Sequence, residues 1–501
     1  MSSDVTLQWG LALVPELLLL ILMLLVLFFN KLKKSASPRD VGMLAAWGAF
    51  AILLTTVGLW FYGVPDSQAG LAESMMWGGM IRSDMVTLVF RVIFLSALII
   101  TSLLSIDEER LQRGEYYALL ISATMGFSLM AASADLIMLY IALETASISS
   151  YLLAGFYTDK ERSVEAGMKY FVYGAFATGV MLYGMSLLYG LTFQTNIYEI
   201  GAMVLGSAAS LPAEANGILL LSAVMIFVGF GFKISAVPLH FWTPDVYQGS
   251  PTPFTGFLST ASKAAGFAVL FRVFASGAVG VPGEESFWWA MLVAIAIITM
   301  TLGNFAAISQ TNIKRMLAYS SIAQAGYLLI GVVTFTAQGA GASMFYLLMY
   351  TFTNITAFGI IALVAKDAGA DEMSDFDGMS RRSPYLALIM LFALLSLSGI
   401  PPTAGFFGKF FIFRAAVDQG LWWLALIGLL NAFVALYYYL SVLKHVYLYS
   451  TDKEDVPIPV SRPAWIGLWV SLIIIIYLGV FAGPAYEWTQ EAASAFYALV
   501  G

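Results

Sequence analysis

The chain has 501 residues, of which 60% are hydrophobic and only 11% are charged, and its formal net charge is −7. This composition excludes a soluble globular domain and predicts an all-α polytopic membrane protein. Cysteine is absent, which excludes disulfides, iron–sulfur clusters and thiolate metal sites, and the two histidines, His240 and His445, are too few for a multi-histidine metal centre. No glycine-rich phosphate loop or long polar segment is present, so redox or nucleotide chemistry would have to lie in another subunit.

Apolar stretches long enough to cross a bilayer recur along the whole chain. A spanning helix needs about 20 residues, and a window of that length finds fourteen candidates. The first begins after a few polar residues and lacks a small-residue cleavage site, so we expect a retained helix and not a signal peptide. The predicted spans are 9–29, 41–62, 84–104, 116–132, 134–156, 164–191, 217–236, 253–275, 286–307, 314–334, 342–365, 384–417, 421–448 and 463–483.

Lysine and arginine are distributed unevenly between the two alternating sets of loops that join these spans. One set holds sixteen of them and the other holds three, Arg82, Arg272 and Arg414. Because basic residues stay on the cytoplasmic side, both termini are expected on the outer side. The sixteen are Lys31, Lys33, Lys34, Arg39, Arg110, Arg113, Lys160, Arg162, Lys314, Arg315, Lys366, Arg381, Arg382, Lys444, Lys453 and Arg462.

Two spans are interrupted by proline, the seventh at 236–238 and the twelfth at 399–402. Irregular backbone at membrane depth survives only where it is buried in protein or lines a water-filled cavity. The breaks are five spans apart, so spans four to eight and nine to thirteen would form two inverted five-helix repeats, each with one broken helix. This predicts four parts: three N-terminal helices in 1–110, the first repeat in 111–280, the second in 281–450, and a last helix with a short tail in 451–501.

Two ionisable residues, Glu144 and Lys233, lie deep in the fifth and seventh spans. A carboxylate as deep as Glu144 must be protonated or paired, and Lys233 is its expected partner. Lys233 ends the first half of a broken helix, where the carbonyl end of the helix dipole favours a cation. A lysine balanced between desolvation and a nearby carboxylate can change protonation when that carboxylate moves, which a pumping site requires. A purely structural ion pair stays open as the alternative.

Lys263 lies in the middle of the eighth span, too far from either surface for its side chain to snorkel. A lysine at that depth costs roughly 3 kcal/mol on insertion scales. Its neighbours Ser262 and Gly266 are small, which leaves room for water and suits a proton relay. His240 follows the first break by two residues and is either a neutral relay between Lys233 and Lys263 or a hydrogen-bonded structural histidine.

Four further features complete the set of candidates. Lys409 stands in the first turn after the second break, where a helix N-terminus disfavours a cation, so it should release its proton readily and suit an exit-side site. The alternative for Lys409 is that its side chain snorkels to a membrane surface and has no transport role. The same alternative is equally open for Lys169, which lies about two turns from a cytoplasmic helix end. Arg91 is expected in a structural ion pair or a packing role, and the tyrosines at 437–439 in packing or interface belts.

Four segments carry a resemblance to a known family: LETASISSYLLAGF, KYFVYGAFATGVMLYGMSLLYGLT, KISAVPLHFWTPDVYQGSPTPFTGFLSTASKAAGFAVL and LLSLSGIPPTAGFFGKFFIF. Over essentially its whole length the chain resembles the antiporter-like membrane subunits of respiratory complex I, the proton-translocating NADH–quinone oxidoreductase, and within them the subunit N group. The resemblance implies a fourteen-helix fold with two inverted repeats and proton translocation coupled to quinone reduction elsewhere. It maps the charged pair of the family onto Glu144 and Lys233, the central relay lysine onto Lys263, the twelfth-helix lysine onto Lys409, and a modulating lysine onto Lys169.

The resemblance also implies partners, cofactors and location. The partners would be other membrane-arm subunits, including further antiporter-like subunits, together with lipids and no nucleic acid. NADH, FMN, iron–sulfur clusters and quinone would sit in partner subunits and none in this chain, and the location would be a bacterial inner membrane rather than a thylakoid-type one. The sequence leaves the electron-donor module open.

The mechanism expected from these residues takes a proton from the cytoplasm to Lys233, passes it through Lys263 and water, and releases it near Lys409. Two alternatives remain: a subunit of a multisubunit sodium/proton antiporter with the same fold, and a mainly structural membrane module. A lysine-rich interior offers few of the oxygen ligands that sodium needs, which favours protons.

Overall fold

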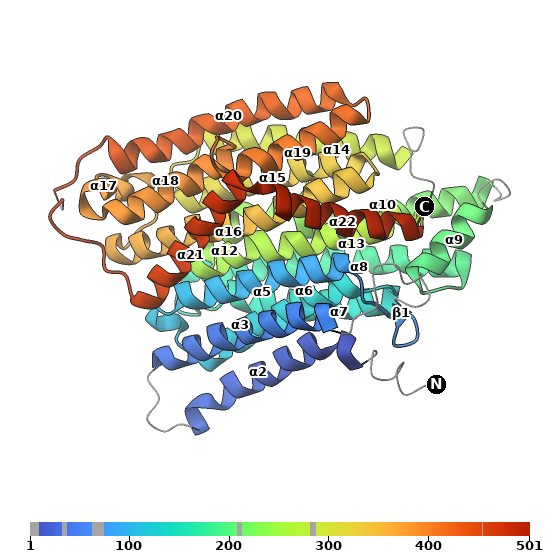
Figure 1. Ribbon diagram of the computed structural model, residues 1–501, viewed down its shortest axis with the longest axis horizontal. Helices are drawn as coiled ribbons and strands as arrows, with labels where there is room; N and C mark the ends of the chain where they lie inside the picture. Colours follow the sequence, from blue (N-terminus) through green and yellow to red (C-terminus); the bar gives the residue numbers. More distant parts are fainter. Residues whose placement is uncertain are drawn as a thin grey trace.

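The computed structural model describes residues 10–32, 38–62, 75–207, 213–280, 287–452 and 454–500. Within these ranges the chain is almost entirely helical, and its strands are a two-stranded antiparallel hairpin of β1 (Met75–Met76) and β2 (Ile81–Arg82). The helices lie side by side and are arranged broadly in chain order, from the blue α2 (Val14–Leu32) at the lower edge of Figure 1 to the orange α20 (Trp422–Tyr447) at its upper edge. Of the basic residues counted in the loops, Lys33, Lys34 and Lys453 lie outside the described residues.

The N-terminal helices α2, α3 (Pro38–Tyr62) and α5 (Met85–Ser105) pack against one another and against the first helix of the next part. That next part covers residues 109–275 and contains the first broken helix. Its elements are η1 (Glu109–Leu111), α6 (Gly114–Ala132), α7 (Leu136–Ala154), α8 (Glu161–Thr192), α9 (Ile197–Ser207), α10 (Ala213–Ile234), α11 (Trp242–Gly249), α12 (Thr252–Phe257), η2 (Leu258–Ser262) and α13 (Lys263–Ala275).

The remaining helices contain the second broken helix and end in a helix that runs across the others (dark red in Figure 1). They are α14 (Phe287–Ile308), α15 (Ile313–Val333), α16 (Ala337–Ala368), η3 (Met373–Phe376), α17 (Met379–Arg382), α18 (Pro384–Ser398), α19 (Ala404–Asp418), α20, α21 (Arg462–Val480) and α22 (Ala482–Val500).

Both predicted breaks are confirmed. The helix α10 ends at Ile234, where Ser235 has a positive φ of 64°, and α18 ends before Gly399, which has a φ of 85° and caps that helix. A left-handed residue stops a helix, and the prolines that follow cannot continue it. In addition, the eighth predicted span contains a π-helical turn, η2, that nothing in the sequence indicated.

Helices occupy all fourteen predicted ranges, and eleven of the described helices are long and apolar enough to cross a membrane. The predicted spans 9–29, 116–132 and 384–417 contain α2, α6 and the pair α18 and α19, which are not among these eleven. The count of fourteen crossings therefore stays a prediction. The described chain also contains helices outside the predicted spans, among them α9, α11, α17 and α22.

The segment that was expected to be a short C-terminal tail forms the 19-residue helix α22. It packs against α16 and α5 through a stripe that includes the buried Ala492, Ala493 and Phe496. These positions recur at helical spacing, which explains why the segment is a helix with one face against the protein.

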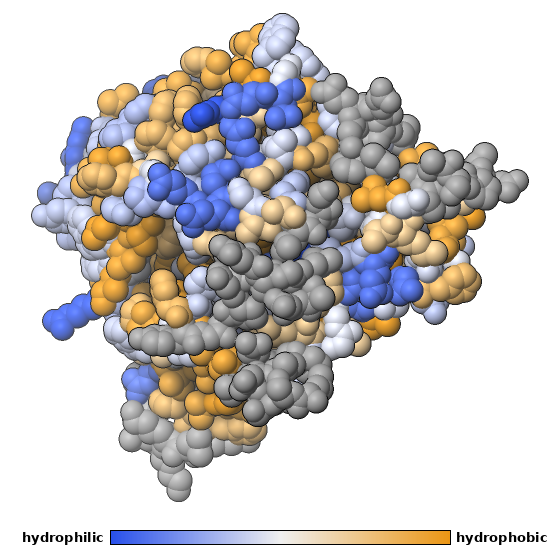
Figure 2. All heavy atoms as spheres, turned by 45° about the vertical axis from the view of Figure 1, so that its right-hand side comes forward, coloured by the Kyte–Doolittle hydropathy of each residue, from blue (hydrophilic) through white to orange (hydrophobic). Residues whose placement is uncertain are grey.

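Large apolar side chains cover the outward faces of α8 and α20, and they include the exposed Phe171, Phe176, Tyr183, Phe433 and Tyr437. The surface seen in Figure 2 shows hydrophobic areas interrupted by hydrophilic patches. Such faces suit lipid or an apolar neighbouring protein. By contrast, α15, α16 and the segment from α12 to α13 are almost wholly buried and form the centre of the molecule.

Candidate functional site

Lys233 is the penultimate residue of α10, directly before the first break. Its side chain is buried, and its Nζ donates a hydrogen bond of 2.9 Å to Oγ of Ser147 on α7. The aromatic ring of Phe127 lies 5.6 Å from the ammonium group. The prediction that this cation sits at the carbonyl end of a half-helix is confirmed, and the dipole of α10 stabilises it there.

Glu144 does not contact Lys233. Among the described residues no ion pair within 4.0 Å joins the two, and Glu144, which is half-buried on α7, has an Oε1 atom without a hydrogen-bond partner. Ser147 follows Glu144 by three residues and therefore lies on the same helix face, one turn further along. The hydroxyl of Ser147 thus contacts Lys233 where the sequence led us to expect the carboxylate. Glu144 still attracts the ammonium group across this gap.

Lys263 is the first residue of α13 and directly follows the π-helical turn η2. Its side chain is 1% exposed, and its Nζ donates to both the backbone oxygen and, over 2.8 Å, the Oγ of Ser321 on α15. Tyr350 of α16 donates to the same Oγ over 3.0 Å. A π turn places one more residue in the helical turn, and such turns recur at functional sites. The mid-span position predicted for Lys263 is confirmed.

Lys409 lies in the second turn of α19, and its surroundings differ from the prediction. Its buried Nζ donates to the backbone oxygens of Leu397, over 3.0 Å, and Ser398, over 2.8 Å. These carbonyls end the preceding half-helix α18, and the ring of Tyr327 lies 5.1 Å from the ammonium. The expectation that a helix N-terminus disfavours this cation is therefore wrong, because its long stem reaches back to a helix C-terminus, which favours one.

A row of polar side chains on α15 lies between Lys263 and Lys409. It consists of two hydrogen-bonded groups, because among the described residues no hydrogen bond joins Ser321, which contacts Lys263, to Ser320. Next to Ser321, Ser320 shares a 2.5 Å hydrogen bond with the hydroxyl of Tyr439 on α20. Gln324 donates to that hydroxyl over 3.3 Å and to the Leu397 oxygen over 3.2 Å, and the same oxygen accepts from Lys409. We call Ser320, Ser321, Gln324 and Tyr439 the α15 bridge.

The sequence analysis missed the α15 bridge. Its signal was present, because Ser320, Ser321 and Gln324 are polar residues on one face of an otherwise apolar span. The tyrosines at 437–439 were expected in packing or interface belts, and they divide between an outward and a buried position. Tyr437 is exposed, but Tyr439 belongs to the bridge and the buried Tyr438 donates to Asn304 over 2.9 Å.

Among the described residues, no hydrogen bond or ion pair joins Lys169 directly to Lys233, Lys263 or Lys409. Lys169 forms ion pairs of 2.6 Å with Glu165 on its own helix and with Asp245 on α11, and Asp245 also pairs with Arg315 of α15 at 2.7 Å. Burial alone would raise the pKa of Asp245, but hydrogen bonds from Lys169 and Arg315 hold that pKa below its usual value. This cluster joins α8, α11 and α15, and the sequence did not point to Asp245.

His240 is buried after the first break, and its Nδ1 has no hydrogen-bond partner in the described structure. No hydrogen bond or ion pair links its ring to Lys233 or Lys263 there, so a bridging role would need water between these groups. Among the residues that the structure describes, no group of three or more histidines and carboxylates could hold a metal ion.

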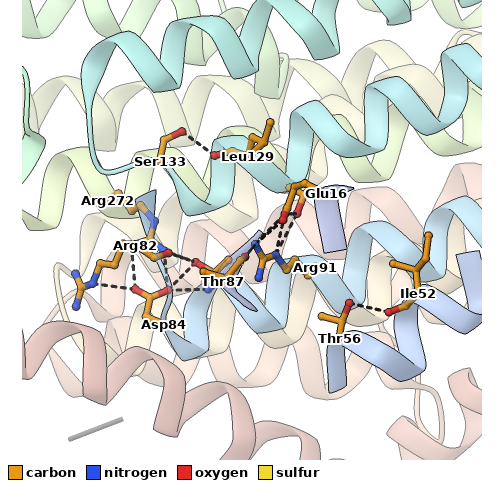
Figure 3. A network of polar contacts seen from close by, with 12 residues as sticks. Glu16, Ile52, Thr56, Arg82, Asp84, Thr87, Arg91, Leu129, Ser133 and Arg272 are labelled. Atoms are coloured by element: carbon orange, nitrogen blue, oxygen red, sulfur yellow. Dashed lines mark hydrogen bonds and ion pairs between the residues drawn. The ribbon is translucent and has the colours of Figure 1, made fainter. Parts of the chain in front are cut away.

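Ion pairs outside this row involve the N-terminal helices; one joins them to α13 and another joins two of them to each other (Figure 3). Arg272, in the last turn of α13, makes bonds of 2.7 and 3.0 Å to Asp84, the N-cap of α5, and Arg82 lies 3.2 Å from the same carboxylate. Both arginines had been counted as loop residues but are fully buried. The structural ion pair expected for Arg91 is confirmed, and its partner is Glu16 of α2, at 2.8 Å.

Comparison with known proteins identifies the family. Residues 133–435 match the family described as NADH:quinone oxidoreductase/Mrp antiporter, transmembrane. A protein of Moorella thermoacetica named NADH-quinone oxidoreductase subunit N is 44% identical over 449 residues, which are 89% of this chain and 92% of that protein. A chain of respiratory complex I from Thermus thermophilus with bound aureothin has 30% identity and a TM-score of 0.77, over 94% of this chain and 98% of that one.

A chain of the Mrp complex from a Dietzia species superposes with a TM-score of 0.83 at 19% identity, covering 99% of both chains, which establishes a common fold only. The subunit N relatives are far more similar in sequence and are matched over nearly their whole length. The chain belongs to the NADH:quinone oxidoreductase/Mrp antiporter family of transmembrane proteins, and within it to the NADH-quinone oxidoreductase subunit N group.

Proposed function

We propose that this chain translocates protons across the membrane as a subunit of an NADH–quinone oxidoreductase, driven by quinone reduction in other subunits. The observation that carries the proposal is the row formed by two buried lysines and the α15 bridge between them. Buried ammonium groups are costly in a membrane protein, and helix packing alone gives no reason to retain Lys263 and Lys409 beside hydroxyls and carbonyls.

The lysines would act in sequence. A proton loads Lys233 from the cytoplasm, passes through water to Lys263, and leaves to the outside beyond Lys409. The hydroxyls next to Lys233 and Lys263 suit this role, because Ser147 and Ser321 can accept from an ammonium and, after rotation, donate to a neutral amine. Lys169 and His240 would support this path, the first through Asp245 and the second through water.

The driving force would arrive electrostatically. A change of charge in a neighbouring subunit would move or neutralise Glu144, which attracts Lys233 without touching it. Because Ser147 lies between them on the face of α7, a small shift of the Glu144 carboxylate changes the field at Lys233 without breaking the contact of Lys233 with Ser147.

The proposed architecture is fourteen spanning helices with two inverted repeats, in 111–280 and 281–450, flanked by 1–110 and 451–501. The lengths of two helices support the correspondence between the two repeats. The helices α8 and α16 each have 32 residues, and each precedes the broken helix of its repeat. In both broken helices a lysine ammonium lies at the carbonyl end of the first half, which supports one functional site per repeat. Both termini would lie on the outer side of a bacterial inner membrane.

We also propose that other membrane-arm subunits, including further antiporter-like ones, and lipids surround the exposed apolar faces of α8 and α20. The chain itself would carry no redox centre. NADH, FMN, iron–sulfur clusters and quinone would be bound by partner subunits.

Lys263→Ala in the assembled complex tests the proposal. We expect proton pumping into proteoliposomes to be nearly abolished and coupled quinone reduction to slow, while the yield of complex stays normal. The matched control is Lys444→Ala, which removes a lysine near the end of α20. A Lys263→Ala complex with an unchanged proton-to-electron ratio would refute the relay.

The same experiment separates the alternatives. A structural module would lose complex yield in Lys263→Ala but keep its activity per assembled complex. A sodium/proton antiporter subunit would show transport that depends on sodium, and its co-purifying partners in mild detergent would lack a quinone reductase.

A further inference from the structure

A polar cavity of about 380 Å³ opens between the ends of α8, α11, α15 and α16. Its lining includes Lys160, Arg162, Ser250, Lys314 and Lys366. These basic residues belong to the loop set that the positive-inside rule assigns to the cytoplasm. The cavity lies at one end of the helix bundle, which this rule would place near the headgroups of the cytoplasmic leaflet, and it is large enough for a small polar ligand.

The charge of this cavity is not balanced by the protein. Five basic side chains line it against two carboxylates, Glu108 and Asp371. Asp371 lies 3.7 Å from Lys314, and the fifth basic residue, Arg110, pairs with Asp159 at 2.7 Å. Lys160 and Arg162 act repulsively on Lys314, which is almost fully buried at the cavity floor. A cluster of like charges with so few counter-charges is stabilised by a bound anion.

Two of the basic groups are available to such an anion. Neither Arg162 nor Lys160 forms an ion pair within the described residues. The Lys160 ammonium lies 4.9 Å from the centre of the Tyr157 ring. A guanidinium offers a planar fork of N–H donors that matches phosphate oxygens, and a lysine adds a point charge beside it.

A buried hydroxyl points to the same kind of ligand. Ser250 lines the cavity, is 2% exposed, and its Oγ has no hydrogen-bond partner. A buried hydroxyl without a partner costs free energy, and a ligand oxygen in the cavity would satisfy it. This hydroxyl and the two available basic groups together favour an anionic oxygen ligand.

We propose that this cavity binds a phosphate group, carried by an anionic phospholipid of the cytoplasmic leaflet or by a soluble phosphate. Basic pockets between transmembrane helices on the cytoplasmic side are suited to anionic headgroups. The bound phosphate would connect the starts of α8 and α15 to the end of α16 and neutralise the charge above Lys314. This site is separate from the lysine row and does not depend on the proposed proton path.

The test uses the assembled complex in detergent, with dihexanoyl phosphatidylglycerol and inorganic phosphate as probes. The variant Lys160→Gln/Arg162→Gln removes the two available charges, and both side chains are exposed at the rim, so assembly should be normal. The control Arg381→Gln/Lys444→Gln removes two charges from the same loop set but not from the cavity. Titration calorimetry measures affinity, and phosphorus analysis measures phospholipid retained per complex.

We expect the cavity variant to lose at least tenfold in affinity for the probe and about one retained phosphate per complex, and the control to match the wild type. Tighter binding of phosphatidylglycerol than of inorganic phosphate would identify a lipid as the source, and equal binding would identify a soluble phosphate. Equal affinities and equal retained phosphorus in the cavity variant and the control would overturn the proposal, as would the absence of binding of either probe to the wild type.

Discussion

Tyr439 is the residue of the α15 bridge whose removal tests the connection between Lys263 and Lys409 most directly. Its buried hydroxyl shares a hydrogen bond with Ser320 and accepts one from Gln324. Tyr439→Phe deletes this hydroxyl and keeps the ring, so the packing of α20 against α15 is preserved. The bridge then has a gap between Ser320 and Gln324.

The expected magnitude follows from these two contacts. A buried hydrogen bond contributes about 1 kcal/mol net, so the loss of two destabilises the connected state by about 2 kcal/mol. If this cost enters the barrier for proton transfer toward Lys409, the step slows by roughly thirtyfold, since 1.4 kcal/mol corresponds to a factor of ten. The assay is the initial rate of proton pumping by the purified complex in proteoliposomes, together with quinone reduction by the same sample.

Tyr116→Phe is the matched control. Tyr116 is also fully buried and shares a 3.0 Å hydrogen bond with a serine, Ser105, but it lies on α6 away from the bridge. The Tyr116→Phe complex should lose about 1 kcal/mol of stability, about half the loss expected for Tyr439→Phe, and keep its pumping rate. Equal pumping rates in the Tyr439→Phe and Tyr116→Phe complexes would refute the argument that the bridge carries protons.

Three further changes test other contacts. Lys409→Arg should strongly reduce coupled proton transport at normal complex yield, because a guanidinium keeps its proton and its fork does not fit the two-carbonyl site. Glu16→Gln leaves the buried Arg91 without its carboxylate and should destabilise the folded chain by about 3 kcal/mol, measured as a lower midpoint of thermal unfolding. Asp245→Asn should lower the free energy of unfolding by about 1 kcal/mol at neutral pH, because both ion pairs of Asp245 are partly exposed.

For each of these substitutions, one experimental result would contradict the prediction. Wild-type pumping in Lys409→Arg would exclude proton release from that lysine. A Glu16→Gln/Arg91→Met double variant should recover part of the lost stability, and unchanged stability in the single variant would show that the pair contributes nothing.

The contribution of Asp245 also has a defined pH dependence. Because its cationic partners hold its pKa below the usual 3.8, the stabilisation is complete above that value and is lost only as the pH falls further. The difference in thermal stability between wild type and Asp245→Asn should therefore be the same at pH 7 and at pH 5. A difference that shrinks over this interval would contradict the assigned pairs.

The depth of the lysines and the position of the helix breaks could be predicted from the sequence. An ammonium in the middle of an apolar run and a proline at membrane depth are both costly, and such costs are visible in any linear pattern of residues. The structure agrees with this prediction: Lys233, Lys263 and Lys409 are all buried, and each lies at or near a helix end or an irregular turn.

The partners of those lysines could not be predicted. Glu144 and Lys233 lie at similar depths in their spans, which suggested that their side chains would be in contact. The rotation of α7 about its axis places Ser147 against Lys233 instead. The place of Lys409 after a proline suggested a helix N-terminus, but its flexible stem reaches the carbonyls of α18. Helix rotation and side-chain direction depend on packing between segments far apart in the chain.

The sequence by itself determined that this protein is a helical membrane protein with two broken helices and lysines at bilayer depth, because the cost of placing charge and free backbone in an apolar phase is local. Only the tertiary structure decided which groups meet those lysines. It brought α15, α18 and α20 together, so that Ser321 contacts Lys263, while Gln324 contacts Tyr439 and shares the Leu397 oxygen with Lys409. Those contacts depend on how separate helices pack, which no single stretch of sequence contains.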